Sequence, residues 1–369
     1  MIDYKYLTEE DRAHFLERGW IQVPNAVNPQ YLDPWMENLW VRLGEDPNDP
    51  STWKEEYLKM PRHREVPYEE YCTPEAWGKL CEIVGGENRM HPYRERYAGD
   101  QFIINFGSDK YDGLHEKGEK PDPQQATGYH IDNDWYRQFL DSAGNALTLI
   151  FLYTDVLENG GGTFLVEDAI PGVCKYLEDH PEGLDHPYDE LVQHAYQCKK
   201  FTQIVGKKGD LFITHQLLPH SHAPNYRRYA RVITNPHINM RENHNLDRAD
   251  GDYNLCEQVI LKALGRDHVS FTPTRDRLIQ YPRTAFFKVA RVKEELARMQ
   301  ADFEAKGLDP ESVDSVYLRG ENAVQEHKKR NGYDKEWGPN GVIQKGTGIG
   351  VEVRAVHDDD TVIPSPVVQ

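Results

Sequence analysis

The sequence predicts a mainly β fold with flanking helices, arranged as a jelly roll, and three features of the chain support this prediction. Short segments rich in β-branched and aromatic residues recur between residues 100 and 238, and most are bounded by Gly, Pro, Asn or Asp. This pattern is typical of antiparallel sheets. Amphipathic segments precede these strands, and a long amphipathic segment follows them. Helices on both sides of a run of strands indicate a jelly roll with helices packed outside it.

The N-terminal part of the chain predicts two helical regions around one strand. The stretch "LTEEDRAHFLERG" has Thr8 as a helix N-cap, acidic residues in the first turn and Gly19 as a terminator. "WIQVP" follows as a strand that stops at Pro24. A second amphipathic segment covers about residues 29 to 43. Residues 44 to 70 are rich in Pro, Asp and Glu, so we expect a surface excursion there.

The central part of the chain predicts the sheets. The expected strands are "DQFIINFG" (100–107), "ALTLIFLYTDV" (146–156), "GTFLV" (162–166), "FTQIV" (201–205), "GDLFITH" (209–215) and "YARVITNPHI" (229–238). The insert at residues 171 to 200 is rich in Pro and Asp and carries His180, His186 and His194. We expect solvent-facing loop residues in this insert, with a mobile lid as the alternative.

The C-terminal part of the chain returns to helical patterns. "TAFFKVARVKEELARMQADFEAKG" (284–307) has apolar residues at helical spacing, a further helix is expected over about 310–330, and the last residues, 357–369, have the composition of a loose tail. The expected organisation is therefore a β domain with N-terminal helices at residues 1–275 and a helical C-terminal extension, 276–369, packed on it.

Charge and cysteine content limit the partners and the cellular location. The formal net charge of −18 repels both a phosphate backbone and an anionic membrane surface, so a small-molecule substrate is the expected partner. A homodimer is compatible with the sequence. The chain has no apolar run of spanning length and no apolar secretion signal at its start, so we expect a cytoplasmic protein. Five scattered cysteines without a CxxC pair predict reduced core residues.

The stretch "GYHIDNDW" (128–135) contains a candidate pair of metal ligands. Alternate residues of an extended chain point the same way, so His130 and Asp132 can reach one centre while Ile131 turns into the packing. An imidazole and a carboxylate suit Fe(II). The motif alone describes a polar turn capped by Asp132 equally well.

A second segment, "GDLFITHQLLPHSHAPNYRRYARVITN" (209–235), contains the candidate third ligand and a candidate anion anchor. Its histidines are His215, which we expect to be a buried and satisfied strand-end residue, and His220 and His222, which share extended-chain parity. One more imidazole beside His130 and Asp132 completes a two-histidine, one-carboxylate triad. Arg231 follows among apolar residues, where an unpaired guanidinium would be costly and a bound carboxylate would satisfy it.

With these residues in place, the sequence resembles the phytanoyl-CoA dioxygenase-like branch of the Fe(II)/2-oxoglutarate-dependent oxygenases. The resemblance runs over roughly the first two thirds of the chain, through "LTEEDRAHFLERGWIQVPNAV", "YHID", "LTLIFLYTDVLENGGGTFLV" and "GDLFITHQLLPHSHAPNYRRYAR". It implies iron ligation by His130, Asp132 and His220, since "LPHSHAPN" corresponds to the stretch that holds the distal histidine in this family. It further implies that Arg231 binds the cosubstrate carboxylate, with Thr163 of the glycine turn beside it.

The sequence departs from the family pattern at several positions near the site. Ser221 and His222 replace small residues after the distal histidine, and Thr127 stands where the family often has a cosubstrate-contacting glutamine. "IPGVCKYL" replaces the family's "IPGSH". Two further assignments come from the residues themselves. Asn105 is either a polar cosubstrate contact or an edge-strand residue, and the aromatic residues Trp135, Tyr136 and Phe139 either line a substrate pocket or pack in the core.

The resemblance implies a double-stranded β-helix, also called a cupin-like jelly roll, that uses Fe(II), 2-oxoglutarate and O2. The implied reaction converts 2-oxoglutarate to succinate and CO2 and oxidises an unactivated C–H bond of a small metabolite, for example an amino acid or a terpenoid-like intermediate of secondary metabolism. Hydroxylation is the default outcome, desaturation or ring closure the variants, and halogenation is disfavoured because Asp132 fills the position that a halide needs. The alternatives are a Zn(II) or Mn(II) hydrolase or isomerase and a non-catalytic binding protein on the same barrel.

Overall fold

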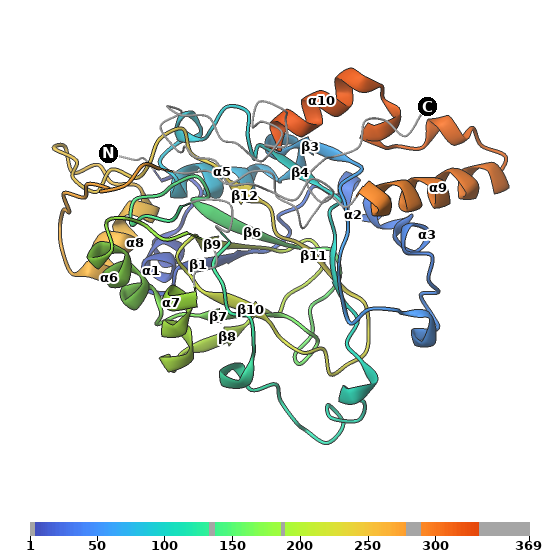
Figure 1. The fold of residues 1–369 in the computed structure, drawn as a ribbon, viewed down its shortest axis with the longest axis horizontal. Helices are drawn as coiled ribbons and strands as arrows, with labels where there is room; N and C mark the ends of the chain where they lie inside the picture. The colour runs from blue at the N-terminus through green and yellow to red at the C-terminus, as the bar shows by residue number, and fades with distance from the viewer. Residues whose placement is uncertain (1–3, 133–136, 186–188, 278–288, 332–369) are drawn as a thin grey trace.

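The computed structural model describes residues 4–132, 137–185, 189–277 and 289–331, and it shows antiparallel sheets at the centre with helices around them (Figure 1). The main sheet has the strand order β1-β9-β6-β11-β5-β2, and β12 pairs with β6. Its strands are β1 (Trp20–Val23), β2 (Tyr57–Lys59), β5 (Ile103–Asn105), β6 (Leu147–Leu152), β9 (Leu211–His215), β11 (Arg231–Thr234) and β12 (His237–Ile238). All pairings in it are antiparallel.

A smaller sheet has the order β10-β7-β8, with β7 (Thr163–Val166), β8 (Phe201–Gln203) and β10 (His220–His222). His130 forms an isolated antiparallel bridge with His220, so the HxD segment lies beside β10. A separate ribbon pairs β3 (Glu65–Pro67) with β4 (Tyr97–Gly99). The prediction of antiparallel sheets is confirmed, but the fold is mixed α/β rather than mainly β, because helices form a large share of the described chain.

The first helix and strand form where the sequence predicts them. Helix α1 (Glu9–Arg18) begins with a capping box, in which the Thr8 side chain accepts from the Asp11 backbone and the Asp11 side chain accepts from the Thr8 backbone. Gly19 ends the helix in the left-handed region at φ 76°, a conformation in which glycine carries no Cβ penalty. Strand β1 then pairs with β9 inside the main sheet.

The segment expected as a surface excursion at residues 44 to 70 is only partly exposed, and that prediction is wrong for its second half. Strand β2 joins the edge of the main sheet beside β5, and Arg62, His63 and Arg64 after it are buried. Composition misled the prediction because these polar residues are buried in ion pairs and hydrogen bonds. Helices α4 (Tyr68–Tyr71) and α5 (Pro74–Ile83) follow, and the predicted helix at 29–43 forms as α2 (Pro29–Met36) and α3 (Leu39–Leu43).

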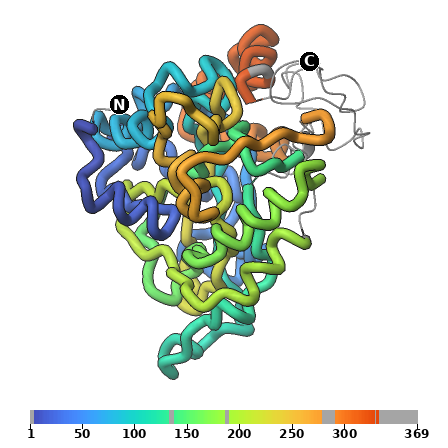
Figure 2. Tube along the Cα trace, turned by 90° about the vertical axis from the view of Figure 1, so that its left-hand side faces the viewer, coloured from blue at the N-terminus to red at the C-terminus, as the bar shows by residue number. Residues whose placement is uncertain are grey.

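The insert at 171 to 200 is also more ordered than the expected solvent-facing loop. Helix α6 (Ile170–Asp179) buries Val173, Cys174 and Leu177, and it packs against α8 (Leu255–Leu264) beside α1 on one side of the sheets (Figure 1). Helix α7 (Asp189–Val192) follows. His186 lies outside the described residues. A different segment projects from the body, the one with the 3-10 turns Asp109–Tyr111 and Pro123–Gln125 (Figure 2).

The C-terminal helices are joined to the rest by buried ion pairs. Helix α9 (Val289–Ala305) packs against α3, and α10 (Glu321–Arg330) follows it (Figure 1). Glu295 of α9 accepts from Arg42 of α3 at 2.9 Å, and both side chains are 0% exposed. Arg42 also pairs with Asp100 at 2.9 Å. The start of the predicted helix at 284–288 and the predicted tail at 357–369 lie outside the described residues.

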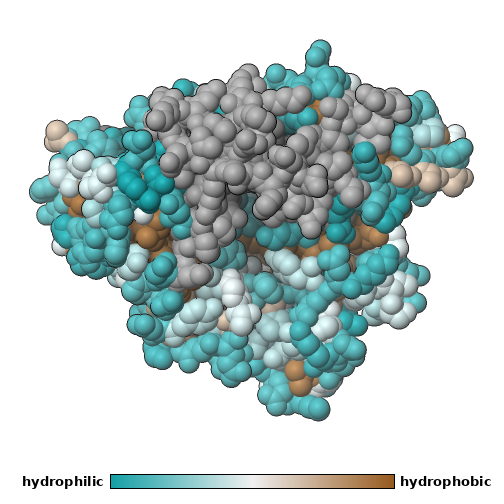
Figure 3. All heavy atoms as spheres, viewed as in Figure 1, coloured by the Kyte–Doolittle hydropathy of each residue, from teal (hydrophilic) through white to brown (hydrophobic). Residues whose placement is uncertain are grey.

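The surface and the cysteines follow the expectations from composition. The face in Figure 3 is mostly hydrophilic where described residues form it. No helix in the described ranges is both long and apolar enough to cross a bilayer. All five cysteines are free and four of them are buried. Burial raises the pKa of the Cys72 and Cys174 thiols, so both are inert core residues.

Candidate metal centre

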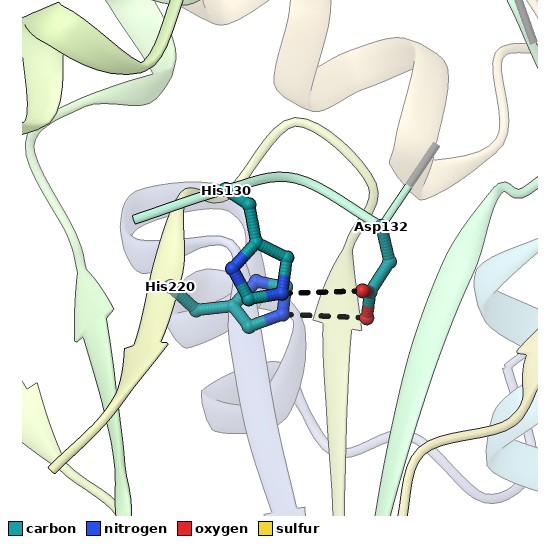
Figure 4. A group of neighbouring side chains, drawn as sticks. All are labelled: His130, Asp132 and His220. Carbon is teal, nitrogen blue, oxygen red and sulfur yellow. Dashed lines mark ion pairs between the residues drawn. The ribbon is translucent and has the colours of Figure 1, made fainter. Parts of the chain in front are cut away.

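Three side chains from two distant parts of the chain converge at one point beside the small sheet. One ligand atom each from His130, Asp132 and His220 lie within 4.8 Å of one another. Nε2 of His130 lies 3.4 Å from Oδ1 of Asp132, and Nε2 of His220 lies 3.3 Å from Oδ2 (Figure 4). Paired backbone hydrogen bonds of 3.0 and 2.9 Å between His130 and His220 fix the two histidines side by side. The chain thus presents two imidazoles and one carboxylate to a common point.

Local hydrogen bonds set the tautomers of both imidazoles. Nδ1 of His130 lies 2.8 Å from the carbonyl oxygen of Gly128, and Nδ1 of His220 lies 3.1 Å from that of Leu218. A carbonyl only accepts, so each Nδ1 donates its proton there, and each Nε2 is the nitrogen turned towards Asp132. A metal bound at this point would displace any proton on Nε2 and take its lone pair.

The Asp132 carboxylate is held in place by residues of two further segments. Nδ2 of Asn235 donates to Oδ2 at 3.1 Å, and Nε2 of His237 lies 3.5 Å from the same oxygen. Nδ2 of Asn145 donates to the Asp132 backbone carbonyl at 2.6 Å. Burial raises the pKa of Asp132, but the charge of His220 and hydrogen bonds from the histidines outweigh it and hold the pKa well below its ordinary value. The carboxylate is ionised, as a metal ligand must be.

Asn235, His237 and Asn145 were not predicted from the sequence. Asn235 and His237 stand two residues apart at the junction of β11 and β12 and have the same parity as His130 and Asp132. This shared parity could have indicated that both side chains point towards the site. Pro236 between them, however, is typical of a strand end, so the sequence did not indicate that the chain continues in extended form. Asn145, just before β6, gives no pattern of its own.

Arg231 is a fully buried cation that the described residues satisfy only in part. Its exposed fraction is 0%, and Nη1 donates to the Ile103 carbonyl at 3.4 Å. Nε and Nη2 are buried and find no hydrogen-bond partner within the described residues. Burial lowers the pKa of Arg231, and the neighbouring tyrosines Tyr57 and Tyr229 offset this only in part. A buried guanidinium with two free donor groups is what a carboxylate ligand would satisfy.

The remaining predicted cosubstrate residues, Asn105, Thr163 and Thr127, have different surroundings in the fold. Asn105 is the direct cross-strand partner of Arg231, but its amide already donates to the Ala223 carbonyl at 2.9 Å and accepts from the Gly107 backbone at 3.0 Å. Thr163 lies on β7 opposite His222 of β10. Thr127 is exposed, and its carbonyl accepts from Oγ of Ser221 at 2.9 Å.

The turn before Thr163 is shaped by glycines that permit close packing. Gly161 has φ 74°, and a Cβ there would lie 2.7 Å from Nδ2 of Asn105. A Cβ on Gly162 would lie 2.1 Å from the backbone oxygen of Ile204. Larger residues cannot occupy these positions without moving the turn, so the glycines fix where β7 starts.

The other candidate residues are placed as follows. His215 is buried, with Nε2 donating to the Cys256 carbonyl at 3.2 Å and Nδ1 accepting from the Leu217 backbone at 3.1 Å, and burial lowers its pKa to about 3. His222 stacks on Tyr57 with ring centroids 4.6 Å apart. Phe139 is a buried core residue. Trp135 and Tyr136 lie outside the described residues.

The three candidate ligands differ in exposure. The side chain of His130 is 47% exposed, while those of Asp132 and His220 are 12% and 8% exposed. The site is therefore open on the His130 side and closed on the side of the sheets.

No family model matches the chain, and no curated protein matches it in sequence. Among solved structures it is similar to the non-heme alpha-ketoglutarate-dependent carbocyclase SnoK from nogalamycin biosynthesis, at 14% identity and a TM-score of 0.39, over 64% of this chain and 86% of SnoK.

It is also similar to HygX from Streptomyces hygroscopicus with nickel, 2-oxoglutarate and hygromycin B bound, at 13% identity and a TM-score of 0.34, over 63% of this chain and 88% of HygX. A third similar structure is GIG2 (DUF1479) from Candida albicans, at 11% identity and a TM-score of 0.41, over 65% of each chain. This likeness is distant, and the chemistry proposed below is derived from the chain's own side chains.

Proposed function

We propose that this protein is an Fe(II)- and 2-oxoglutarate-dependent dioxygenase that oxidises an unactivated C–H bond of a small metabolite. The proposal rests on two features that occur together in this fold. One is the convergence of His130, Asp132 and His220 within 4.8 Å, and the other is the buried, incompletely satisfied guanidinium of Arg231. The first could hold a metal ion, and the second could bind the far carboxylate of a ligand that chelates this metal.

The residues present fit ferrous iron. Two imidazoles whose Nε2 atoms face one ionised carboxylate provide the donor set of the facial triad once the metal displaces any Nε2 proton, and this set leaves positions open for other ligands. When bound there, iron would supply the activation of dioxygen that C–H oxidation requires. Asn235 and His237 hold the carboxylate oxygen that faces His220, so Asp132 keeps one orientation.

Arg231 gives the site its selectivity for a dicarboxylate cosubstrate. It presents Nε and Nη2 as an unused fork of donors, which matches a carboxylate in two-pronged geometry. Asn235, which donates to Asp132, directly follows the strand that begins with Arg231, and this link supports a shared site for the guanidinium and the ligand cluster. A 2-oxo dicarboxylate can then chelate the metal at one end and be held by Arg231 at the other.

We propose that the two sheets form a double-stranded β-helix, whose small sheet continues past β10 into the HxD segment. The His130–His220 bridge supports this continuation. Substrate would approach from the open His130 side. Hydroxylation is the expected outcome, with desaturation or ring closure as variants. Halogenation is disfavoured because Asp132 occupies the third ligand position.

The proposal is tested by anaerobic titration of the protein with Fe(II) and then 2-oxoglutarate. We expect the weak visible charge-transfer absorption of a 2-oxo acid chelated to ferrous iron, which a Zn(II) hydrolase does not give. Admission of air should then yield succinate and CO2 in an iron-dependent manner. Asp132→Ala should abolish both signals, while Asp155→Ala, an exposed carboxylate paired with Lys207, serves as the matched control. Full activity in Asp132→Ala, or turnover with Zn(II) alone, would refute the proposal.

A further inference from the structure

A cross-strand row of the main sheet places an aromatic side chain beside the Arg231 guanidinium. Arg231 of β11 pairs with Asn105 of β5, and Asn105 pairs on its other side with Tyr57 of β2. Residues that pair directly across strands point to the same face of a sheet. Tyr57 therefore lies on the face that carries Arg231, and its hydroxyl interacts with the guanidinium.

A second aromatic ring comes from the small sheet and meets the first. His222, two residues after His220 on β10, stacks on Tyr57 with centroids 4.6 Å apart and an interplanar angle of 28°. His222 is exposed, whereas Ser221 and Ala223 beside it are buried, so its ring faces open space.

Strand β2 runs along this region from the arginine towards the candidate metal ligands. Lys59 has the same parity as Tyr57, and its charge acts on both His130 and His222. Leu58 between them is buried on the opposite face. Tyr57 and Lys59 of the edge strand therefore face the site. The Tyr57–His222 stack lies beside the region between the ligand cluster and Arg231.

We propose that the Tyr57–His222 stack is the side wall of the 2-oxo acid site and sets the length of acid that the protein accepts. This inference rests on the proposed function. Asn235, which directly follows the strand that begins with Arg231, donates to the Asp132 carboxylate, so the distance between the two anchors is fixed. A 2-oxo acid with one more methylene is too long for this distance, so its carbon chain has to bend sideways to reach both the metal and Arg231. The stacked rings occupy the side towards which it would bulge.

The experiment compares the binding of 2-oxoglutarate and 2-oxoadipate by calorimetry to the Co(II)-loaded protein, so that no turnover is needed. Misfitting one methylene in a fitted pocket costs about 10- to 200-fold in discrimination. We expect the protein to bind 2-oxoglutarate at least about tenfold more tightly than 2-oxoadipate, and His222→Ala to lower this ratio by about tenfold. His222→Ser is the second variant, in case alanine perturbs folding, and His194→Ala in the 3-10 turn Gln193–Gln197 is the matched control.

Two variants of Tyr57 distinguish the steric effect of the stacked rings from the effect of the Tyr57 hydroxyl beside Arg231. Tyr57→Phe keeps the ring, so the ratio should stay unchanged while 2-oxoglutarate binds a few-fold more weakly for lack of the hydroxyl. Tyr57→Ala should lower the ratio as His222→Ala does. If the ratio of the affinities for 2-oxoglutarate and 2-oxoadipate stays unchanged in both folded His222 variants, the Tyr57–His222 stack does not set the length of the acid. Failure of the unaltered Co(II)-loaded protein to bind 2-oxoglutarate would instead overturn the proposed function.

Discussion

Nδ2 of Asn235 donates a 3.1 Å hydrogen bond to Oδ2 of Asp132, the oxygen that also faces Nε2 of His220. Asn235 follows directly after β11, the strand that begins with Arg231. The carboxylate of the candidate triad and the candidate anion anchor are therefore positioned by one short segment of the chain.

Asn235→Ala should weaken metal binding without unfolding the protein. Loss of a partner that orients a metal ligand typically costs about 10- to 100-fold in metal affinity. Titration with Co(II), followed by its visible absorption, measures the change. The control is Asn48→Ala, an exposed asparagine far along the chain from the site. An affinity equal to that of the control would show that Asn235 does not position Asp132.

Arg231→Met should affect stability and cosubstrate binding in opposite directions. The guanidinium is buried with unsatisfied donors, and such burial costs about 1 to 3 kcal/mol in protein mutational data, so the free energy of unfolding without ligand should rise by up to that amount. Excess 2-oxoglutarate at 100 times its Kd should stabilise the metal-loaded unaltered protein by about 2.7 kcal/mol and leave the variant unchanged.

Urea denaturation with and without 2-oxoglutarate measures both effects for Arg231→Met. The exposed Arg241→Met is the matched substitution. A variant that is strongly destabilised, yet still stabilised by 2-oxoglutarate, would assign Arg231 a structural role in place of the anion site.

Glu295→Ala should destabilise the attachment of α9 to the sheets. Glu295 is 0% exposed and pairs with Arg42, so its removal leaves that buried cation short of one partner. Breaking a buried pair in this way costs about 3 to 5 kcal/mol. Thermal unfolding and hydrogen exchange of α9 measure the effect. The neighbouring Glu294→Ala, whose side chain is 62% exposed and pairs with Arg298, should change stability little, and equal melting temperatures of the two variants would contradict the prediction.

Stability should fall in acid because of the same cluster. Burial raises the pKa of Asp100 and of Glu295, but the charge of Arg42 and further partners outweigh burial and lower both values. A carboxyl whose folded pKa is depressed stabilises the fold above its ordinary pKa, and this contribution is lost as the pH falls towards the folded value. The free energy of unfolding should therefore decrease below about pH 4.

Urea titrations at successive pH values between neutrality and strong acid test this dependence. Glu295→Gln should be less stable at neutral pH and show a shallower acid loss, since it has one titrating carboxyl fewer. An identical slope in the variant would exclude Glu295 from the acid transition.

The local elements of this protein were predictable where short-range chemistry decides them. The capping box of Thr8 and Asp11, the glycine terminator Gly19 and the strands around β6 and β9 all depend on residues close in sequence. The candidate ligands were also visible, because His130 and Asp132 form a local motif and His220 and Arg231 lie in one segment. Each of these patterns lies within one short segment of the chain.

The residues that surround the ligands were not predictable in the same way. Tyr57 comes from a segment whose Pro-, Asp- and Glu-rich composition indicated an exposed excursion. In the same segment Arg64 is buried, because it pairs with Asp100 at 2.8 Å. Composition records the charge of each residue but not whether a partner from a distant segment compensates for it.

The sequence by itself determined α1 with its caps, the central strands and the identity of the candidate ligands, since these follow from interactions between near neighbours. Only the tertiary structure decided that β2 borders the site, that Tyr57 stacks on His222 and that Asn235 holds Asp132. These contacts arise from strand order and register. Pairing between distant strands depends on the packing of the whole core, and no local pattern specifies it.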